Sequence, residues 1–452
     1  MIAPAMLLTG ACVLPPESAG DDDDNDSFTS TGGANGVGDG VGHSAEATGN
    51  AGDESDESAG TTDTGPSETE DSETEDSETE SETGEPACSP IGPAGLPGVN
   101  PGFIWVPTLH YLKPTVAKID TETMMEVARY RTTELEQASP ESVAVSLSGN
   151  PVVADDPGGV WERGELTKFY GDLADCVDVN GDGVITTSSG VNDVLPWDQE
   201  ECRAWSLPLD YRYQAPAVWT PGVFNMETCE YDNEKVWSGG IRQDDGTMEV
   251  ILVDGEAGTI VEQIPVDVGD STYGLFTLAV DAEGNLWGTT ISPQTSLTRI
   301  DRETFEVETW PVAGSWSLSI GRSGYVFACG LNGVARFDPT TETWTQAPPQ
   351  LVAREDCVED HLGRLWLEGY GEVTAVDVET FAVVETVVMN TLIEGIAMDF
   401  NERLWGTGFT NTSQIHRVDL DTGVQLDIDH ITMVNARTSD MTGFLLAQLV
   451  AP

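Results

Sequence analysis

The residues best suited to chemistry in this 452-residue chain form one short run, Asp178-Val179-Asn180-Gly181-Asp182-Gly183-Val184-Ile185-Thr186. Side-chain oxygens recur at alternate positions, a glycine allows the sharp turn at the sixth, and a backbone carbonyl falls at the seventh. These features reproduce the first nine positions of a calcium-binding loop, in which alternate residues turn toward the centre. We therefore expect Ca²⁺ in a structural role, bound by Asp178, Asn180, Asp182, Val184 and Thr186.

The run departs from a complete calcium loop at its twelfth position, where Ser189 replaces the usual bidentate glutamate. The last ligand would then come from the acidic residues that follow, which are Asp193, Asp198, Glu200 and Glu201. The alternative is an Asp/Asn/Gly turn that needs no metal. Cys176 and Cys202 flank this segment, and we expect a disulfide between them to hold the insertion at residues 171–206.

The sequence contains none of the common catalytic motifs. The five histidines are thinly spread, at His43, His110, His361, His416 and His430, without the spacing of a metal site. Neither a G-x-S-x-G elbow nor a phosphate-binding glycine loop is present. Paired carboxylates are abundant, but they carry little information in a chain with a net charge of −60. The sequence therefore assigns no catalytic residue.

The insertion must be positioned by the surrounding sequence, and that sequence recurs with a period of about 40 residues. An aromatic residue follows the same kind of turn at Trp287, Phe327, Trp366 and Trp405, with spacings of 40, 39 and 39. Within each repeat the apolar residues alternate, which indicates short antiparallel strands. Because a four-stranded meander cannot bury both faces alone, the repeats must pack around an axis. The pattern predicts an all-β fold, a β-propeller over residues 102–452.

Seven blades are the favoured number, and six or eight are alternatives. The first repeat lacks a strand before residues 103–107, whereas the C-terminal run SDMTGFLLAQLV at 439–450 belongs to no repeat. An unpaired blade edge is a template for aggregation, so the two ends should meet. We expect the C-terminal run to complete blade one as a strand and to close the ring.

The most regular residues of the repeats have structural interpretations. Aspartates at the strand ends precede Thr-rich turns and should cap backbone N–H groups; they are Asp120, Asp301, Asp338, Asp377 and Asp419. The tryptophans Trp287, Trp366 and Trp405 have the volume to fill the wedge between blades. Neither set predicts a site.

The N-terminal 101 residues are of another kind. Residues 1–12 resemble a bacterial signal peptide with a lipobox, Thr9-Gly10-Ala11-Cys12, and Cys12 would carry the lipid. Residues 13–101 are rich in Asp, Glu, Ser, Thr and Gly, and we expect a disordered acidic linker. The remaining six cysteines suit disulfides outside the cytoplasm, with Cys329–Cys357 as a bridge between neighbouring blades.

The charge excludes some partners. Residues 87–452 alone carry a net charge of −37. A surface this acidic repels nucleic acid and anionic lipid headgroups, so we expect membrane contact only through the lipid anchor. A monomer that holds a protein, glycan or small molecule fits these observations.

The repeat VDAEGNLWGTT, followed by LTRIDRETFEVETW, resembles the virginiamycin B lyase type of seven-bladed propeller and NHL-like propellers. With the lipobox, linker and calcium-loop-like insertion, the chain resembles uncharacterised secreted propeller lipoproteins of myxobacterial type. The resemblance to the lyases implies His and Glu residues with magnesium at one channel mouth. That set does not carry over, because Tyr370 stands where a histidine would follow Glu368. We expect a non-catalytic binding module, with a lyase or hydrolase at the channel mouth as the alternative.

Overall fold

The computed structural model describes residues 102–450, apart from short gaps at 111–112, 159–162, 215, 270, 292–294, 313–314, 331, 354–355, 390–391, 409–413 and 430–439. The predicted signal peptide, Cys12 and the acidic linker at 13–101 lie outside the described residues. None of the helices in the described part of the chain has the length and apolarity that crossing a membrane requires.

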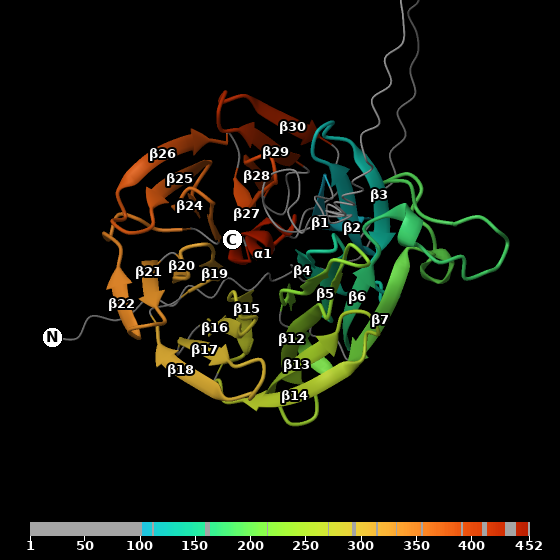
Figure 1. The fold of residues 1–452 in the computed structure, drawn as a ribbon, viewed down its shortest axis with the longest axis horizontal. Helices are drawn as coiled ribbons and strands as arrows, with labels where there is room; N and C mark the ends of the chain where they lie inside the picture. The colour runs from blue at the N-terminus through green and yellow to red at the C-terminus, as the bar shows by residue number, and fades with distance from the viewer. Residues whose placement is uncertain are drawn as a thin grey trace, which may run out of the picture. The chain divides into compact units, whose positions relative to one another are not determined.

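Seven sheets form the seven blades of a β-propeller, as predicted, and follow one another around a central axis in chain order (Figure 1). The strands of blades one to three are β1 (Phe103–His110), β2 (Lys113–Asp120), β3 (Glu126–Arg131), β4 (Ser139–Val145), β5 (Pro151–Asp156), β6 (Gly164–Phe169), β7 (Arg203–Leu209), β8 (Tyr211–Gln214), β9 (Val218–Trp219), β12 (Lys235–Arg242), β13 (Met248–Asp254) and β14 (Ile260–Val266). In blade three, β8 and β9 both pair with β12 and together form the inner strand.

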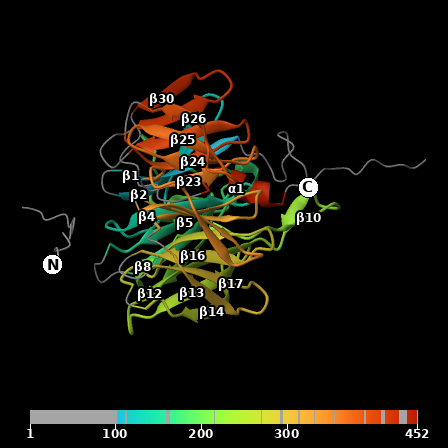
Figure 2. The same ribbon diagram turned by 90° about the vertical axis from the view of Figure 1, so that its left-hand side faces the viewer.

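Blades four to seven have four strands each in sequential antiparallel order. Their strands are β15 (Leu275–Val280), β16 (Leu286–Thr290), β17 (Ser296–Ile300), β18 (Val307–Pro311), β19 (Ser317–Ile320), β20 (Val326–Gly330), β21 (Gly333–Asp338), β22 (Thr343–Gln346), β23 (Cys357–Glu359), β24 (Arg364–Glu368), β25 (Glu372–Asp377), β26 (Val383–Val388), β27 (Ile393–Met398), β28 (Arg403–Gly408), β29 (Gln414–Asp419) and β30 (Gln425–Asp429). A further hairpin, β10 (Val223–Asn225) with β11 (Glu230–Asp232), projects from one face of the ring (Figure 2).

Large aromatic side chains fill the wedges between blades. Trp287, Trp366 and Trp405 are at most 1% exposed, which confirms the prediction from the repeat. The indole N–H of each donates to a carboxylate six residues earlier, which is Asp281, Asp360 or Asp399, at 2.8–2.9 Å. These carboxylates also accept backbone N–H groups of their own turns. Each wedge residue is thereby fixed to the turn that precedes its strand.

The corner aspartates cap turns as expected. Asp301 accepts the backbone N–H of Thr304 at 2.9 Å and of Glu303 at 3.0 Å. These hydrogen bonds hold the pKa of Asp301 below its usual value. The same arrangement recurs at the other four corner residues, Asp120, Asp338, Asp377 and Asp419. Their regularity is explained by turn structure.

The C-terminal run closes the ring as a helix, and the expectation that it would do so as a strand was wrong. Main-chain hydrogen bonds join Met441 to Trp105 of blade one and Asp440 to Val145 of blade two. The chain then turns into α1 (Phe444–Leu449), which lies at the centre of the ring (Figure 1). Its sequence, Phe-Leu-Leu-Ala-Gln-Leu, favours a helix because Leu, Ala and Gln lose little side-chain freedom there.

The carboxylate of Asp440 holds the start of α1. It accepts the backbone N–H groups of Leu445 and Leu446 at 3.2 and 2.9 Å. At the other end, Gln448 donates its side-chain amide to the carbonyl of Glu359 in blade six. Burial raises the pKa of Asp440 from 3.8 to about 6, against the opposing effect of these backbone hydrogen bonds.

This titration predicts how stability depends on pH. A carboxyl group with a raised pKa in the folded state favours folding when protonated, and that contribution is lost as pH rises through about 6. Asp440→Asn retains an acceptor for α1 but cannot ionise. Between about pH 5 and about pH 7.5, wild type should lose on the order of 1 kcal/mol more unfolding free energy than the variant.

Urea titrations of both proteins at the two pH values measure this difference. Other buried carboxyl groups with raised pKa values, Glu165, Glu234 and Glu359, are common to both proteins and cancel. Equal pH dependence of the two proteins would show that Asp440 does not titrate in this range.

Candidate functional site

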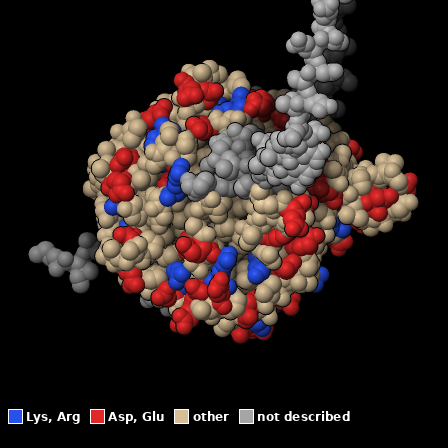
Figure 3. All heavy atoms as spheres, viewed as in Figure 1, with Lys and Arg blue, Asp and Glu red and all other residues tan. Residues whose placement is uncertain are grey.

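The insertion at 171–206 connects β6 to β7 and protrudes from the outer side of blade two (Figure 1). Its regular structure consists of two short 3₁₀ turns, η1 (Leu173–Asp175) and η2 (Trp197–Gln199). The predicted disulfide Cys176–Cys202 is present and joins the two ends of the insertion. Acidic side chains gather on this protrusion and are spread over the blades on the face that Figure 3 presents.

The calcium-loop-like run forms a turn held by hydrogen bonds to its own side chains. The carboxylate of Asp178 accepts the backbone N–H groups of Gly181 at 2.6 Å and Gly183 at 2.8 Å. Asn180 and Asp182 each accept an N–H group two residues later. Asp178, Asn180 and Asp182 thus turn side-chain oxygens toward the loop backbone. Carboxylate and amide oxygens of this kind are ligands that suit Ca²⁺.

Two of the acidic residues considered for the last ligand pack against the loop. Glu201 is 4% exposed and accepts N–H groups of Val179, Asn180 and Thr186. Glu200 accepts from Thr187 and Ser188. In the described part of the chain, no three His, Cys, Asp or Glu side chains form a group that could hold a metal ion. The backbone N–H groups that donate to the carboxylate of Glu201 hold the loop in this structure.

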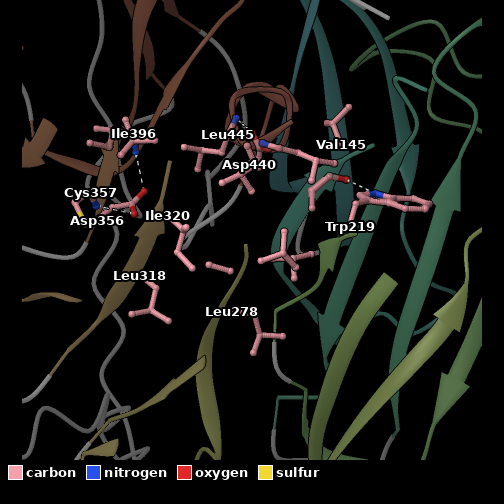
Figure 4. A pocket seen from close by; sticks show the side chains of 17 residues that line it. Val145, Trp219, Leu278, Leu318, Ile320, Asp356, Cys357, Ile396, Asp440 and Leu445 are labelled. Atoms are coloured by element: carbon pink, nitrogen blue, oxygen red, sulfur yellow. Dashed lines mark hydrogen bonds between the residues drawn. The ribbon is translucent and has the colours of Figure 1, made fainter. Parts of the chain in front are cut away.

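The ring has two mouths with different contents. At the mouth where the inner strands end, α1 enters the channel and leaves a cavity of ≈ 590 Å³, counting the part open to solvent (Figure 4). Its lining is mostly aliphatic, with the carboxylates Asp356 and Asp440. Asp356 accepts the hydroxyl of Ser317 and the backbone N–H of Ile396, so it ties blade six to blades five and seven. Both carboxylates therefore already have structural partners.

The other mouth, where the inner strands begin, is called the strand-start mouth below. Four aromatic residues of blades three to five meet there, Tyr213, Tyr273, Phe276 and Trp316. Ring centroids are 5.1 Å apart for Tyr213–Tyr273, 6.2 Å for Tyr273–Phe276 and 5.7 Å for Phe276–Trp316, all in T-shaped contacts. Tyr273 is 43% exposed and Trp316 is 36% exposed. Two large rings thus face solvent at this mouth.

Irregularities of strand pairing place residues at this mouth. The register shifts by one residue at the start of the inner strands β4, β15 and β27, and the extra residues are Glu141, Phe276 and Glu394. A β-bulge re-aims a side chain relative to the regular alternation. Equivalent positions of three blades therefore carry either a carboxylate or an aromatic ring.

A buried acidic group lies next to the bulge of blade two. Asp155 is fully buried and pairs across the strands with Glu165. Burial raises the pKa of Asp155 well above its ordinary value, and the charges of Glu165 and Glu141 raise it further, while a hydrogen bond from Thr132 lowers it. Thr132 donates to Oδ1 of Asp155 at 2.7 Å, and Thr133 donates to Glu165. Oδ2 of Asp155 is buried, and no group in the described part of the chain donates to it.

Gln214 joins Asp156, the residue after Asp155 in β5, to the blade of Tyr213. Its backbone N–H donates to Asp156 at 3.2 Å, and its side-chain amide donates to Ser238 at 2.9 Å. The side-chain oxygen of Gln214 is buried and accepts no hydrogen bond from the described residues. Tyr213 precedes Gln214 in β8. Sequence reasoning missed these residues because they form no motif and come from separate blades.

The residues that the lyase resemblance points to have structural surroundings instead. Glu368 is fully buried and accepts the backbone N–H of Asp356 at 3.1 Å. Tyr370, at the position of the expected histidine, is 71% exposed. His416 lies in blade seven with Nδ1 at 2.7 Å from Asp427, and His361 pairs with Glu402 in a turn. These described residues are not gathered at one mouth.

No protein-family model and no curated protein matches the chain. Solved structures similar to it include apo AztD from Citrobacter koseri, with 14% identity, TM-score 0.46, and coverage of 74% of this chain and 96% of that one. A functionally unknown protein from Desulfotomaculum acetoxidans has 10% identity, TM-score 0.49, and coverage of 75% and 98%. The Pan2 WD40 domain of Neurospora crassa has 11% identity, TM-score 0.47, and coverage of 69% and 85%.

Proposed function

We propose that the protein is an extracytoplasmic binding module that holds its ligand at the strand-start mouth without transforming it. The observation that carries this proposal is the exposure of Tyr273 and Trp316 beside Phe276 and Tyr213. Aromatic residues are enriched in binding sites because they offer a large rigid contact area. The other mouth contains α1 and the cavity beside it, whose lining is mostly aliphatic.

The rigidity of the surroundings supports this choice of mouth. Phe276 is 6% exposed and contacts Tyr213, Tyr273 and Trp316, so the exposed rings rest on a packed base. Preformed sites bind well because little side-chain freedom is lost on binding. The disulfide Cys329–Cys357 joins β20 of blade five to β23 of blade six near Trp316, whose backbone N–H donates to the carbonyl of Cys329.

The double variant Tyr273→Ala/Trp316→Ala tests the proposed mouth. We expect ligands found by saturation-transfer NMR with a library of small peptides, glycans and aromatic fragments to lose at least about tenfold in affinity for this variant. Both side chains are partly exposed, so the fold should tolerate the change.

Leu362→Ala is the matched control, because Leu362 is an exposed apolar residue in the turn between β23 and β24, at the end of the inner strand opposite to the proposed mouth. Ligands that bind the double variant and wild type equally would place the binding surface elsewhere.

We propose a structural calcium ion in the insertion. Asp178, Asn180 and Asp182 supply side-chain oxygens, and Glu201 is the residue best placed to complete the set because it already contacts the loop backbone. Extracellular modules with such loops bind Ca²⁺ with dissociation constants of about 10⁻⁴ to 10⁻³ M. Bound Ca²⁺ would stabilise a segment that has little core of its own.

Calorimetric titration of calcium into the wild type and into Asp178→Ala/Asp182→Ala measures this directly. Wild type should bind in that range, and the variant should lose binding because two carboxylates are removed. Asp175→Ala, an exposed aspartate of the same insertion outside the loop, should bind like wild type. Absence of binding to wild type, or unchanged binding to the double variant, would refute the site.

We also propose that the protein is a lipoprotein tethered by its acidic linker. The two described disulfides support a location outside the cytoplasm, where such bonds persist. Cys229 is disulfide-bonded as well, and the one remaining cysteine of the six, Cys88, lies outside the described residues.

Mass spectrometry of the protein purified from its own membranes tests the anchor. We expect a mature chain that begins at Cys12 and carries a diacylglyceryl group. A mature N-terminus at another residue, or an unmodified Cys12, would contradict the proposal.

A further inference from the structure

A pocket of ≈ 510 Å³, counting the part open to solvent, lies between blades three and four. Its walls come from the base of the β10–β11 hairpin, from β12 and β13, and from the turn between β17 and β18. Thr220, one of its lining residues, follows the last residue of β9. The pocket is therefore on the side of the ring where the inner strands end, opposite to the strand-start mouth.

Two cationic side chains extend to this pocket, one from each blade. Lys235 shares one face of β12 with Trp237, because side chains alternate along a strand, and the indole of Trp237 donates to the carbonyl of Gly284 in blade four at 3.0 Å. Arg302 comes from blade four and lies against the same glycine. A Cβ at Gly284 would be 2.9 Å from a guanidinium nitrogen of Arg302 and 3.3 Å from Pro221 at the hairpin base. Both cations thus lie at the boundary between the two blades.

Hydrogen bonds hold the backbone of both residues in place. The N–H of Lys235 donates to the hydroxyl of Thr220 at 3.0 Å, and its carbonyl accepts the N–H of Thr220 at 2.8 Å. The N–H of Arg302 donates to the side-chain oxygen of Asn285 at 3.1 Å. The two cations therefore start from fixed positions, which lowers the cost of ordering them around a ligand.

Neither cationic group has a hydrogen bond or an ion pair with another side chain in the described part of the chain. Arginines elsewhere in the ring are paired, as Arg364 is with Asp360 at 2.6 Å and Arg403 with Asp399 at 2.8 Å. Residues 87–452 carry a net charge of −37, so carboxylates are in large excess over cations. Two cations that share a pocket and yet lack a carboxylate partner indicate a site for an anionic group.

The other lining residues limit what that anion can be. Glu303 also lines the pocket and would repel a second negative charge on a ligand. Asp254 lies opposite Lys235 on β13, but its carboxylate accepts the backbone N–H groups of Glu256 and Ala257 in its own turn. A ligand with one negative charge fits these surroundings better than a polyanion.

We propose that this pocket binds a small molecule with a single carboxylate on a short apolar body. Lys235 and Arg302 bind the carboxylate through charge-assisted hydrogen bonds. Pro221, Val223 and Leu252, which also line the pocket, contact the apolar body. The site is separate from the strand-start mouth and goes beyond the function proposed for that mouth.

The test compares 4-methylpentanoate with 4-methylpentanamide, which has nearly the same shape without the charge. NMR titration of the full chain should give the carboxylate a dissociation constant at least about tenfold lower than that of the amide. Lys235→Gln and Arg302→Gln should each raise the dissociation constant of the carboxylate at least about threefold and leave that of the amide unchanged. Glu303→Gln should lower it, because a repelling charge is removed.

Arg212→Gln is the matched control, since it changes the net charge equally at an exposed residue of β8, where the inner strand of blade three begins. It should alter neither affinity. No binding of 4-methylpentanoate, equal affinity for the two probes, or equal losses in Arg212→Gln and the two pocket variants would overturn the site. Any of these results would leave the strand-start mouth untouched, because Tyr273→Ala/Trp316→Ala tests that mouth separately.

Discussion

The hydrogen bond between a buried tryptophan and the carboxylate six residues earlier is the interaction on which the rest of this structure depends. A propeller blade tapers toward the axis, and the wedge between blades must be filled by a large side chain. A buried indole N–H also needs an acceptor. Asp360 meets both demands for Trp366, because its carboxylate accepts the indole N–H and the backbone N–H groups of Leu362 and Arg364. Packing of the wedge and folding of the turn are thereby coupled.

Departures from this regular frame produce the properties that distinguish one mouth of the channel from the other. At one mouth α1 buries Phe444, Leu446 and Ala447 and replaces solvent by apolar contacts. At the strand-start mouth, bulges at the beginning of three inner strands turn carboxylates and an aromatic ring out of the regular alternation. Burial then raises the pKa of Asp155, because the low dielectric disfavours its charged form. The rigid frame holds these groups in place at the cost of desolvating them.

Most of the frame could be predicted from sequence because it rests on local periodicity. The spacing of Trp287, Trp366 and Trp405 predicted the blades, and the aspartates at strand ends predicted the turns that they cap. The disulfides Cys176–Cys202 and Cys329–Cys357 followed from the position of their cysteines relative to the insertion and the repeats. The helix α1 was missed, because a run that suits either a strand or a helix takes the form that its surroundings can bury.

The sequence by itself determined the ring of β-strand repeats, their period of about 40 residues and the position of the insertion, since each depends on residues close together in the chain. Only the tertiary structure brings together the residues of the proposed binding mouth. Tyr213, Phe276 and Trp316 belong to three blades, and Asp155 becomes a buried acceptor only beside Glu141 and Glu165. Such neighbourhoods depend on how blades pack around the axis, and neither composition nor spacing records that packing.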